Sequence, residues 1–183
     1  MRLAVGIPSN GDIKAETVSC VVQALFQTKM SGLGLIFPKG CLIHENRIAI
    51  AEEVLEKGFD YLMCIDSDIT FKPDSINRLL AQNKKIIGAN YHIRGKLPLT
   101  NTVLWTGVPP TETFKCEGIA MGFVLIDVGV FKLIDPPWFF FESLGGNAFM
   151  GEDYWFCKRA REKGIDVWCD PSIEIGHLGE YKF

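Results

Sequence analysis

The sequence predicts an α/β protein with a mostly parallel sheet flanked by helices. Two observations lead to this fold class. In residues 3–89, short apolar runs alternate with helix-length segments of amphipathic spacing, which is the alternation of a doubly wound sheet. Breaks rich in glycine, proline or polar residues, such as residues 8–11 and 38–40, separate these runs. At 183 residues, the chain is expected to form one domain around one core.

The expected elements follow in chain order. We expect strands at residues 3–7, 32–37, 61–65 and 85–89, with helices at 14–28, 43–57 and 73–81 between them. The helix at 14–28 is expected to bury Val18, Val21, Val22 and Leu25 on one face. After residue 90 the alternation ends, and residues 97–126 are typical of extended pieces that join the sheet from another direction. A helix at 152–163 and strands at 166–169 and 173–175 complete the chain.

The composition favours neither nucleic acid nor membrane as a partner. The formal net charge is -3, whereas nucleic-acid binding normally requires a basic face. No apolar window is long enough for a transmembrane helix, and the first apolar run is too short for a signal peptide. The six cysteines include no Cys-x-x-Cys pair, so we expect reduced, partly buried thiols in a cytoplasmic protein.

Two aspartates directly follow the apolar run 61–65. In an extended segment, residues i and i+2 point to the same side, so Asp66 and Asp68 are expected to converge on one divalent cation, Mn²⁺ or Mg²⁺. Open α/β sheets also bind ligands at the carboxyl ends of their strands. The alternative is that both aspartates serve only turns or caps. Because neighbouring carboxylates repel each other unless a cation or hydrogen bonds offset the charge, the cation site is favoured.

The same segment matches a motif of a different enzyme class. Residues 66–70 fit the Asp-x-Asp-x-Thr pattern of haloacid-dehalogenase-type phosphatases, in which the first aspartate accepts the phosphoryl group and the second is the acid/base. That motif normally ends the first core strand, whereas two strand-helix units precede Asp66 here. The order of elements therefore disfavours the phosphatase alternative.

Four further residues carry side chains suited to a polar site. Glu152 and Asp153 begin a predicted helix, where a carboxylate either stabilises the helix dipole or faces a cleft and accepts a proton from a hydroxyl. His177 lies between two glycines and is either a surface residue or a third ligand for Mn²⁺. Arg47 falls on the apolar face of its helix, so it must reach an anionic ligand or form an internal salt bridge, for instance with one of the aspartates.

Taken in order, these segments resemble GT-A-type glycosyltransferases of the family 2 kind, in a short form similar to those of phage and bacterial genomes. The resemblance spans nearly the whole chain and rests on Pro8-Ser9, Arg47, Asp66-Ser67-Asp68, the strand 122–126, Gly151-Glu152-Asp153 and Gly176-His177. It implies a single GT-A domain over residues 1–183, with a nucleotide-binding half at 1–90 and an acceptor-binding half at 91–183. If the chain is phage-encoded, the expected location is the host cytoplasm.

The resemblance also implies a role for each site residue. The activity would be transfer of a hexose from a nucleoside-diphosphate sugar, UDP-linked as in UDP-glucose, to a hydroxyl acceptor. The residues implied to bind this donor are Pro8, Ser9, Arg47, Asp66, Ser67 and Lys182. Asp68 and His177, with Asp66 beside them, would hold Mn²⁺ or Mg²⁺. Asp153, next to Glu152, would be the base of an inverting displacement, or would bind the acceptor in a retaining enzyme.

Other features bear on the acceptor and on the alternatives. Family members often carry Arg-Asn where this chain has Arg47-Ile48, so no amide contact is expected from position 48. The Gln-x-x-Arg-Trp motif of processive synthases is absent, which argues against long-chain synthesis. Trp105, Trp138 and Phe139 could stack on a sugar, although aromatics of a small protein belong to the core by default. A binding module without turnover is the remaining alternative, and Asp153 argues against it.

Overall fold

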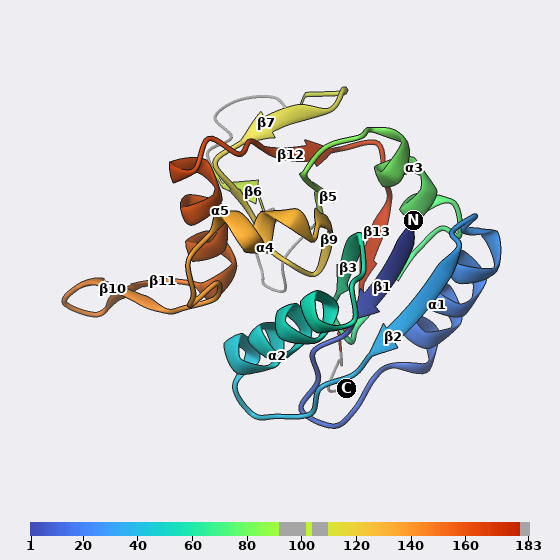
Figure 1. Cartoon of the computed structure of the whole chain (residues 1–183), viewed down its shortest axis with the longest axis horizontal. Helices are drawn as coiled ribbons and strands as arrows, with labels where there is room; N and C mark the ends of the chain where they lie inside the picture. The colour runs from blue at the N-terminus through green and yellow to red at the C-terminus, as the bar shows by residue number, and fades with distance from the viewer. Residues whose placement is uncertain (92–101, 104–109, 180–183) are drawn as a thin grey trace.

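The computed structural model describes residues 1–91, 102–103 and 110–179, and it confirms the predicted fold class. The main sheet contains, in spatial order, β2 (Gly32–Ile36), β1 (Arg2–Gly6), β3 (Tyr61–Ile65), β9 (Phe123–Asp127), β5 (Ile86–Ala89), β12 (Val167–Asp170) and β7 (Phe114–Cys116) (Figure 1). β1 pairs in parallel with β2 and β3, and β5 pairs in parallel with β12. β9 and β7 are antiparallel to their neighbours, so strands of the second half do enter from another direction.

In the described part of the chain, five helices cover the two faces of the sheet. They are α1 (Ala15–Gln27), α2 (Ile43–Glu56), α3 (Ser75–Ala81), α4 (Gly129–Leu133) and α5 (Glu152–Glu162). Side chains of α1 and α3 share one core with Leu3, Val5 and Met63, whereas side chains of α2, α4 and α5 share the other with Leu62 and Val124. The central strands are therefore buried on both faces, which explains why they appear in the sequence as continuous apolar runs.

Among the described residues, three small two-stranded sheets lie outside the main sheet, and they were not predicted as such. They are β4 (Ile69–Phe71) with β13 (Ile175–His177), β6 (Thr102–Val103) with β8 (Gly118–Ile119), and β10 (Glu142–Gly145) with β11 (Ala148–Met150). The β10–β11 hairpin projects from the body of the molecule beside α5 (Figure 1). The β4–β13 pair brings the end of the described chain next to the turn after β3.

The burial of α1 and of two aromatic side chains can be compared with the expectations from the sequence. The predicted apolar face of α1 is wrong in part: Val21 is buried as expected, but Val18 and Val22 are exposed, and the helix also buries Thr17 and Ala24. Trp138 and Phe139 are core residues, as expected for aromatic residues of a small protein. Trp138 donates its indole N–H to the backbone oxygens of Phe131 and Ile134. Trp105 lies outside the described residues.

The remaining sequence expectations concern membrane spans and thiols. None of the helices in the described part of the chain is long and apolar enough to cross a bilayer. All six cysteines are free, and Cys64, Cys116, Cys157 and Cys169 are buried.

Candidate functional site

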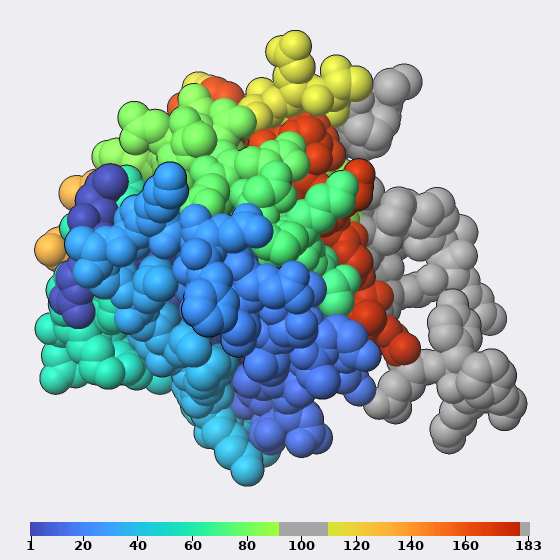
Figure 2. Space-filling view, turned by 90° about the vertical axis from the view of Figure 1, so that its right-hand side faces the viewer, coloured from blue at the N-terminus to red at the C-terminus, as the bar shows by residue number. Residues whose placement is uncertain are grey.

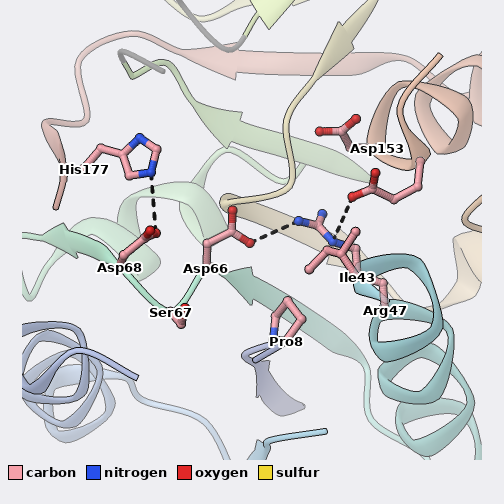
Figure 3. A pocket seen from close by; sticks show the side chains of 9 residues that line it. Pro8, Ile43, Arg47, Asp66, Ser67, Asp68, Asp153 and His177 are labelled. Carbon is pink, nitrogen blue, oxygen red and sulfur yellow. Dashed lines mark hydrogen bonds and ion pairs between the residues drawn. The ribbon is translucent and has the colours of Figure 1, made fainter. Parts of the chain in front are cut away.

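An open pocket of about 430 Å³ lies beyond the carboxyl ends of β1 and β3 (Figure 3). The residues that line it are Pro8, Ile43, Arg47, Asp66, Ser67, Asp68, Glu152, Asp153 and His177. Among these, only Ile43 was not predicted as a site residue. They come from loops after two parallel strands, from the first turns of α2 and α5, and from β13. The fold thus gathers side chains from both halves of the sequence around one space.

Arg47 is the buried cation of this pocket, with 5% of its surface exposed. Its Nη2 donates to Oδ1 of Asp66 at 3.0 Å, and its Nε lies 3.5 Å from Oε1 of Glu152. Burial lowers the pKa of Arg47, but Asp66, Glu152 and Asp153 outweigh that effect and raise the pKa above its ordinary value. The predicted internal salt bridge therefore exists. Within the described part of the chain, the buried Nη1 and Nε donate no hydrogen bond, and Nε makes only its ion pair with Glu152.

The two aspartates after β3 face different partners, because the chain turns at residues 67–68 instead of staying extended. The N–H of Asp66 donates to the backbone oxygen of Gly122 at 3.0 Å, and the oxygen of Ser67 accepts bonds from Lys14 N–H and the Thr17 hydroxyl. Asp66 then points to Arg47, and Asp68 points to His177 (Figure 3). The expectation that this segment stays extended is therefore wrong, whereas convergence of the two aspartates on one cation stays a prediction.

Asp68 and His177 form the pair that could hold a divalent cation. In the β4–β13 ladder His177 lies opposite Ile69, and Leu178 N–H donates to the backbone oxygen of Asp68 at 2.8 Å. This register places Nε2 of His177 3.5 Å from Oδ1 of Asp68. Neighbouring ligands of an octahedral ion with bonds of about 2.1 Å lie roughly 3 Å apart, so this pair fits such an ion after a small adjustment.

The pair would need additional ligands. Among the described residues, no three His, Cys, Asp or Glu side chains gather into a complete metal site. Mg²⁺ and similar hard cations commonly keep several waters and bind one or two carboxylates together with substrate phosphates. Asp68 and His177 are therefore suited to be the protein ligands of a cation site that a phosphorylated ligand completes.

Asp153 is the titratable carboxyl best suited to proton transfer. Burial raises its pKa from 3.8 to about 6, and the neighbouring charge of Glu152 acts in the same direction. Arg47 and the N–H of Tyr154, 2.8 Å from Oδ1 of Asp153, partly oppose the shift. A carboxyl group with a pKa near the operating pH is an effective general base.

Tyr91 was not predicted as a site residue, and Gly122 was expected only as part of the strand 122–126. Tyr91 is buried beside the pocket, its ring lies edge-on to His177 at 5.7 Å between centroids, and its hydroxyl is bonded to the backbone of Gly122. Burial and the charge of Asp66 raise its pKa. One signal could have found it, since Tyr91 follows β5 at the sheet edge that β1 and β3 also reach.

Ser9, a predicted donor-binding residue, is not among the residues that line the pocket. The hydroxyl of Ser9 is used within its own loop, where it donates to the oxygen of Asp12 at 3.1 Å and accepts from Gly11 N–H at 2.9 Å. Lys182 lies outside the described residues, so its predicted role stays a prediction.

Comparison with known proteins shows the fold. No protein-family model matches the sequence, and no curated protein is significantly similar to it. The crystal structure of A197 from STIV matches with a TM-score of 0.70 over 98% of this chain and 87% of that chain, at 16% identity. At that identity the likeness shows the fold alone, which is a GT-A-like α/β fold.

Two further solved structures are similar to a smaller degree. A glycosyltransferase involved in the glycosylation of the major capsid of PBCV-1 has a TM-score of 0.42 at 13% identity, over 75% of this chain and 70% of that chain. S. aureus TarS 1-349 has a TM-score of 0.49 at 11% identity, over 94% of this chain. The chain spans 61% of that TarS structure. The fold assignment rests on the match to A197.

Proposed function

We propose that this protein is a metal-dependent glycosyltransferase that moves a hexose from a UDP-linked sugar to a hydroxyl acceptor. One observation carries the proposal. The 430 Å³ pocket is lined by the buried guanidinium of Arg47, whose Nη1 donates no hydrogen bond to a described residue, by the Asp68–His177 pair and by a carboxyl group whose pKa is about 6. The guanidinium is suited to binding a diphosphate, the Asp68–His177 pair to holding a divalent cation, and the carboxyl group to accepting a proton from a hydroxyl.

The charge of the pocket supports a role for a metal ion. Among the described residues, four carboxylates line the pocket against one arginine, so a diphosphate would meet net repulsion from these side chains. A divalent cation held by Asp68 and His177 would supply the missing positive charge and stabilise the diphosphate as it leaves. Mn²⁺ and Mg²⁺ both suit a carboxylate, an imidazole and phosphate oxygens.

Arg47 binds the donor in this proposal, and Glu152 positions Arg47. The guanidinium is fixed between Asp66 and Glu152, and its remaining N–H groups can donate to a phosphate oxygen. Glu152 is 7% exposed and its carboxylate faces Arg47, so it is poorly placed to meet an acceptor. We assign the proton transfer to Asp153 alone.

In the proposed reaction, the acceptor oxygen displaces UDP from the sugar. Asp153 accepts the proton of the acceptor hydroxyl while that oxygen forms a bond to the anomeric carbon of the sugar. The bond from this carbon to the diphosphate oxygen breaks, and UDP leaves with the electron pair. Residues 1–90 would contribute most of the donor side and residues 91–183 the acceptor side. The free cysteines are compatible with the predicted cytoplasmic location.

Release of UDP from a panel of UDP-sugars in the presence of Mn²⁺ tests the proposal. We expect turnover with at least one donor, and loss of turnover in Asp68→Ala and Asp153→Asn. The matched control is Glu174→Gln, a carboxylate on the surface that pairs with Lys72 outside the pocket. A melting-temperature screen of donors with Mn²⁺ would identify the sugar, because a bound ligand stabilises the folded chain.

Two outcomes would overturn the proposal in favour of the alternatives. Hydrolysis of a phosphomonoester that is lost in Asp66→Asn, without binding of any UDP-sugar, would indicate the phosphatase. Donor binding without turnover for any acceptor would indicate the binding module.

A further inference from the structure

One edge of the main sheet and one flank of α1 present an apolar surface that the described part of the chain does not cover. Its members, here called the β2 edge surface, are exposed by 43% to 88%: Val18, Val22, Phe26, Leu33, Leu35 and Phe37. Figures 1 and 2 show α1 and β2 next to each other on the same side of the molecule. Contiguous apolar patches on a monomer commonly mark an interaction site.

The leucines of β2 lie on the α1 side of the sheet. A Cβ placed on Gly34 would run into the ring of Phe59, and Ile36 belongs to the same core as Phe59. Gly34 and Ile36 thus face the α2 side. Because side chains alternate along a strand, Leu33 and Leu35 face the opposite side, where α1 lies. The stripe Val18, Val22 and Phe26 repeats every four residues, so it forms one flank of α1.

β2 is the end strand of the main sheet and lacks the usual protection of an edge. No described strand pairs with its outer side. Residues 31–37 contain no charged residue and no proline. The opposite edge strand, β7, has three residues and carries exposed Lys115, which pairs with Asp166. Exposed strand edges are normally blunted by such short length or charge, because their free N–H and C=O groups recruit another strand.

We propose that the β2 edge surface is a homodimer interface in which β2 pairs antiparallel with β2 of a second copy across a two-fold axis. Such an axis, perpendicular to the sheet, joins the two sheets and places both α1 helices on the same face. The Leu33 and Leu35 side chains of both copies then form the floor of a shared apolar layer, and the two α1 flanks form its walls. A lone extended peptide would satisfy the strand edge but would leave the α1 flank exposed, which is why a second copy fits better.

The amphipathic pattern of α1 agrees with this interface. Val18 and Val22 belong to the apolar face that the sequence predicts to be buried, but the chain alone leaves them exposed. A helix normally buries its whole apolar stripe against some partner. Pairing through β2 would bury the part of the stripe that the monomer does not.

Sedimentation velocity of the purified chain over about 1 to 100 μM tests the proposal. We expect a species near twice the chain mass of 20.5 kDa. Leu35→Lys should raise the dimer dissociation constant by at least about 100-fold, because symmetry places the introduced charge twice in one apolar interface. Phe26→Lys, at a side chain that is 88% exposed and cannot disturb the monomer core, should also weaken the dimer. A wild-type chain that stays monomeric throughout this range would overturn the proposal.

The control and a second readout make the test specific. Leu144→Lys, on the β10–β11 hairpin and 57% exposed, should leave the dimer intact. In hydrogen exchange, amides of residues 31–37 should become more protected at high concentration in the wild type but not in Leu35→Lys. A dimer that Leu144→Lys dissociates and Leu35→Lys does not would place the interface on the hairpin and refute ours. Since the β2 edge surface lies outside the pocket, this proposal and the proposed transferase activity can fail separately.

Discussion

Nε2 of His177 lies 3.5 Å from Oδ1 of Asp68, although the two residues come from different halves of the chain. The β4–β13 ladder and the bond from Leu178 N–H to Asp68 fix this approach through the backbone. The pair is therefore preformed by the fold and does not depend on a ligand to bring it together.

The first prediction concerns this pair. His177→Ala and Asp68→Ala should each weaken Mn²⁺ binding in the presence of UDP by at least about tenfold, because each removes one of the two protein ligands. The measurement is the Mn²⁺ concentration needed for half of the UDP-induced increase in melting temperature. Glu174→Gln should require the same concentration as the wild type. Unchanged Mn²⁺ dependence in His177→Ala would exclude His177 as a ligand.

The second prediction concerns Arg47, which compensates two carboxylates from a buried position. Arg47→Met should lower the free energy of unfolding by about 3 to 5 kcal/mol, since it leaves Asp66 and Glu152 without their partner. Urea denaturation measures the change. Arg159→Met is the control, because Arg159 forms a surface pair with Glu162 and its loss should cost less than about 1 kcal/mol.

A double variant separates the stability role of Arg47 from donor binding. Arg47→Met combined with Glu152→Gln should regain part of the lost stability, because one of the uncompensated charges is removed. It should still fail to bind UDP, because the donors of the guanidinium are absent. Recovery of UDP binding in the double variant would contradict the donor-binding role of Arg47.

The third prediction is the pH dependence of turnover. With Asp153 as the base, kcat/KM should rise about tenfold per pH unit below about pH 6 and level off above it, since only the ionised carboxylate accepts a proton. Asp153→Asn should lower kcat/KM by about 10²- to 10⁴-fold and should abolish the pH-dependent rise. In Glu152→Gln the rise should move to lower pH, because the charge of Glu152 helps to raise the pKa of Asp153. A rise that persists in Asp153→Asn would assign the base elsewhere.

The same carboxyl group predicts a stability effect with a definite sign. The pKa of Asp153 in the folded chain, about 6, is above its ordinary 3.8, so folding favours the protonated form. The stabilising contribution is complete below pH 3.8 and is lost as the pH rises through 6. Asp153→Asn cannot ionise, so it should become more stable than the wild type between these pH values, by up to about 3 kcal/mol above pH 6. Denaturation at pH 4, 6 and 8 measures this, and a difference that does not vary with pH would refute it.

Sequence patterns predicted the parts of the fold that depend on long apolar runs and the site residues that follow them. Strand 61–65 matches β3, and the helix at 43–57 matches α2 to within one residue. Because parallel strands end at one edge of the sheet, residues after β1 and β3 could be expected near each other before any contact was known. The helix start at Glu152 matches that of α5, and its first turn reaches the same pocket.

The remainder depended on interactions that sequence spacing does not encode. The direction of Asp66 is determined by a backbone bond to Gly122 and by Arg47, both remote in sequence, so local alternation gave the wrong geometry. The β10–β11 hairpin and α4 are too short for periodicity to identify. Ser9 carries a side chain typical of a ligand contact, but loop hydrogen bonds use it.

The last prediction concerns Gly122, where the backbone packs closely against the site. A Cβ at this position would collide with the hydroxyl of Tyr91 and lie 2.8 Å from Oδ2 of Asp66. Gly122→Ala should therefore displace both side chains, lower the free energy of unfolding by about 1 to 3 kcal/mol and weaken UDP binding. Gly179→Ala is the control, because no atom of the described residues, its chain neighbours aside, lies within 4 Å of its added Cβ. Adding Tyr91→Phe to Gly122→Ala removes the closest obstructing atom and should restore part of the stability, as measured by urea denaturation. If the double variant is no more stable than Gly122→Ala, contact with the Tyr91 hydroxyl is not what requires glycine here.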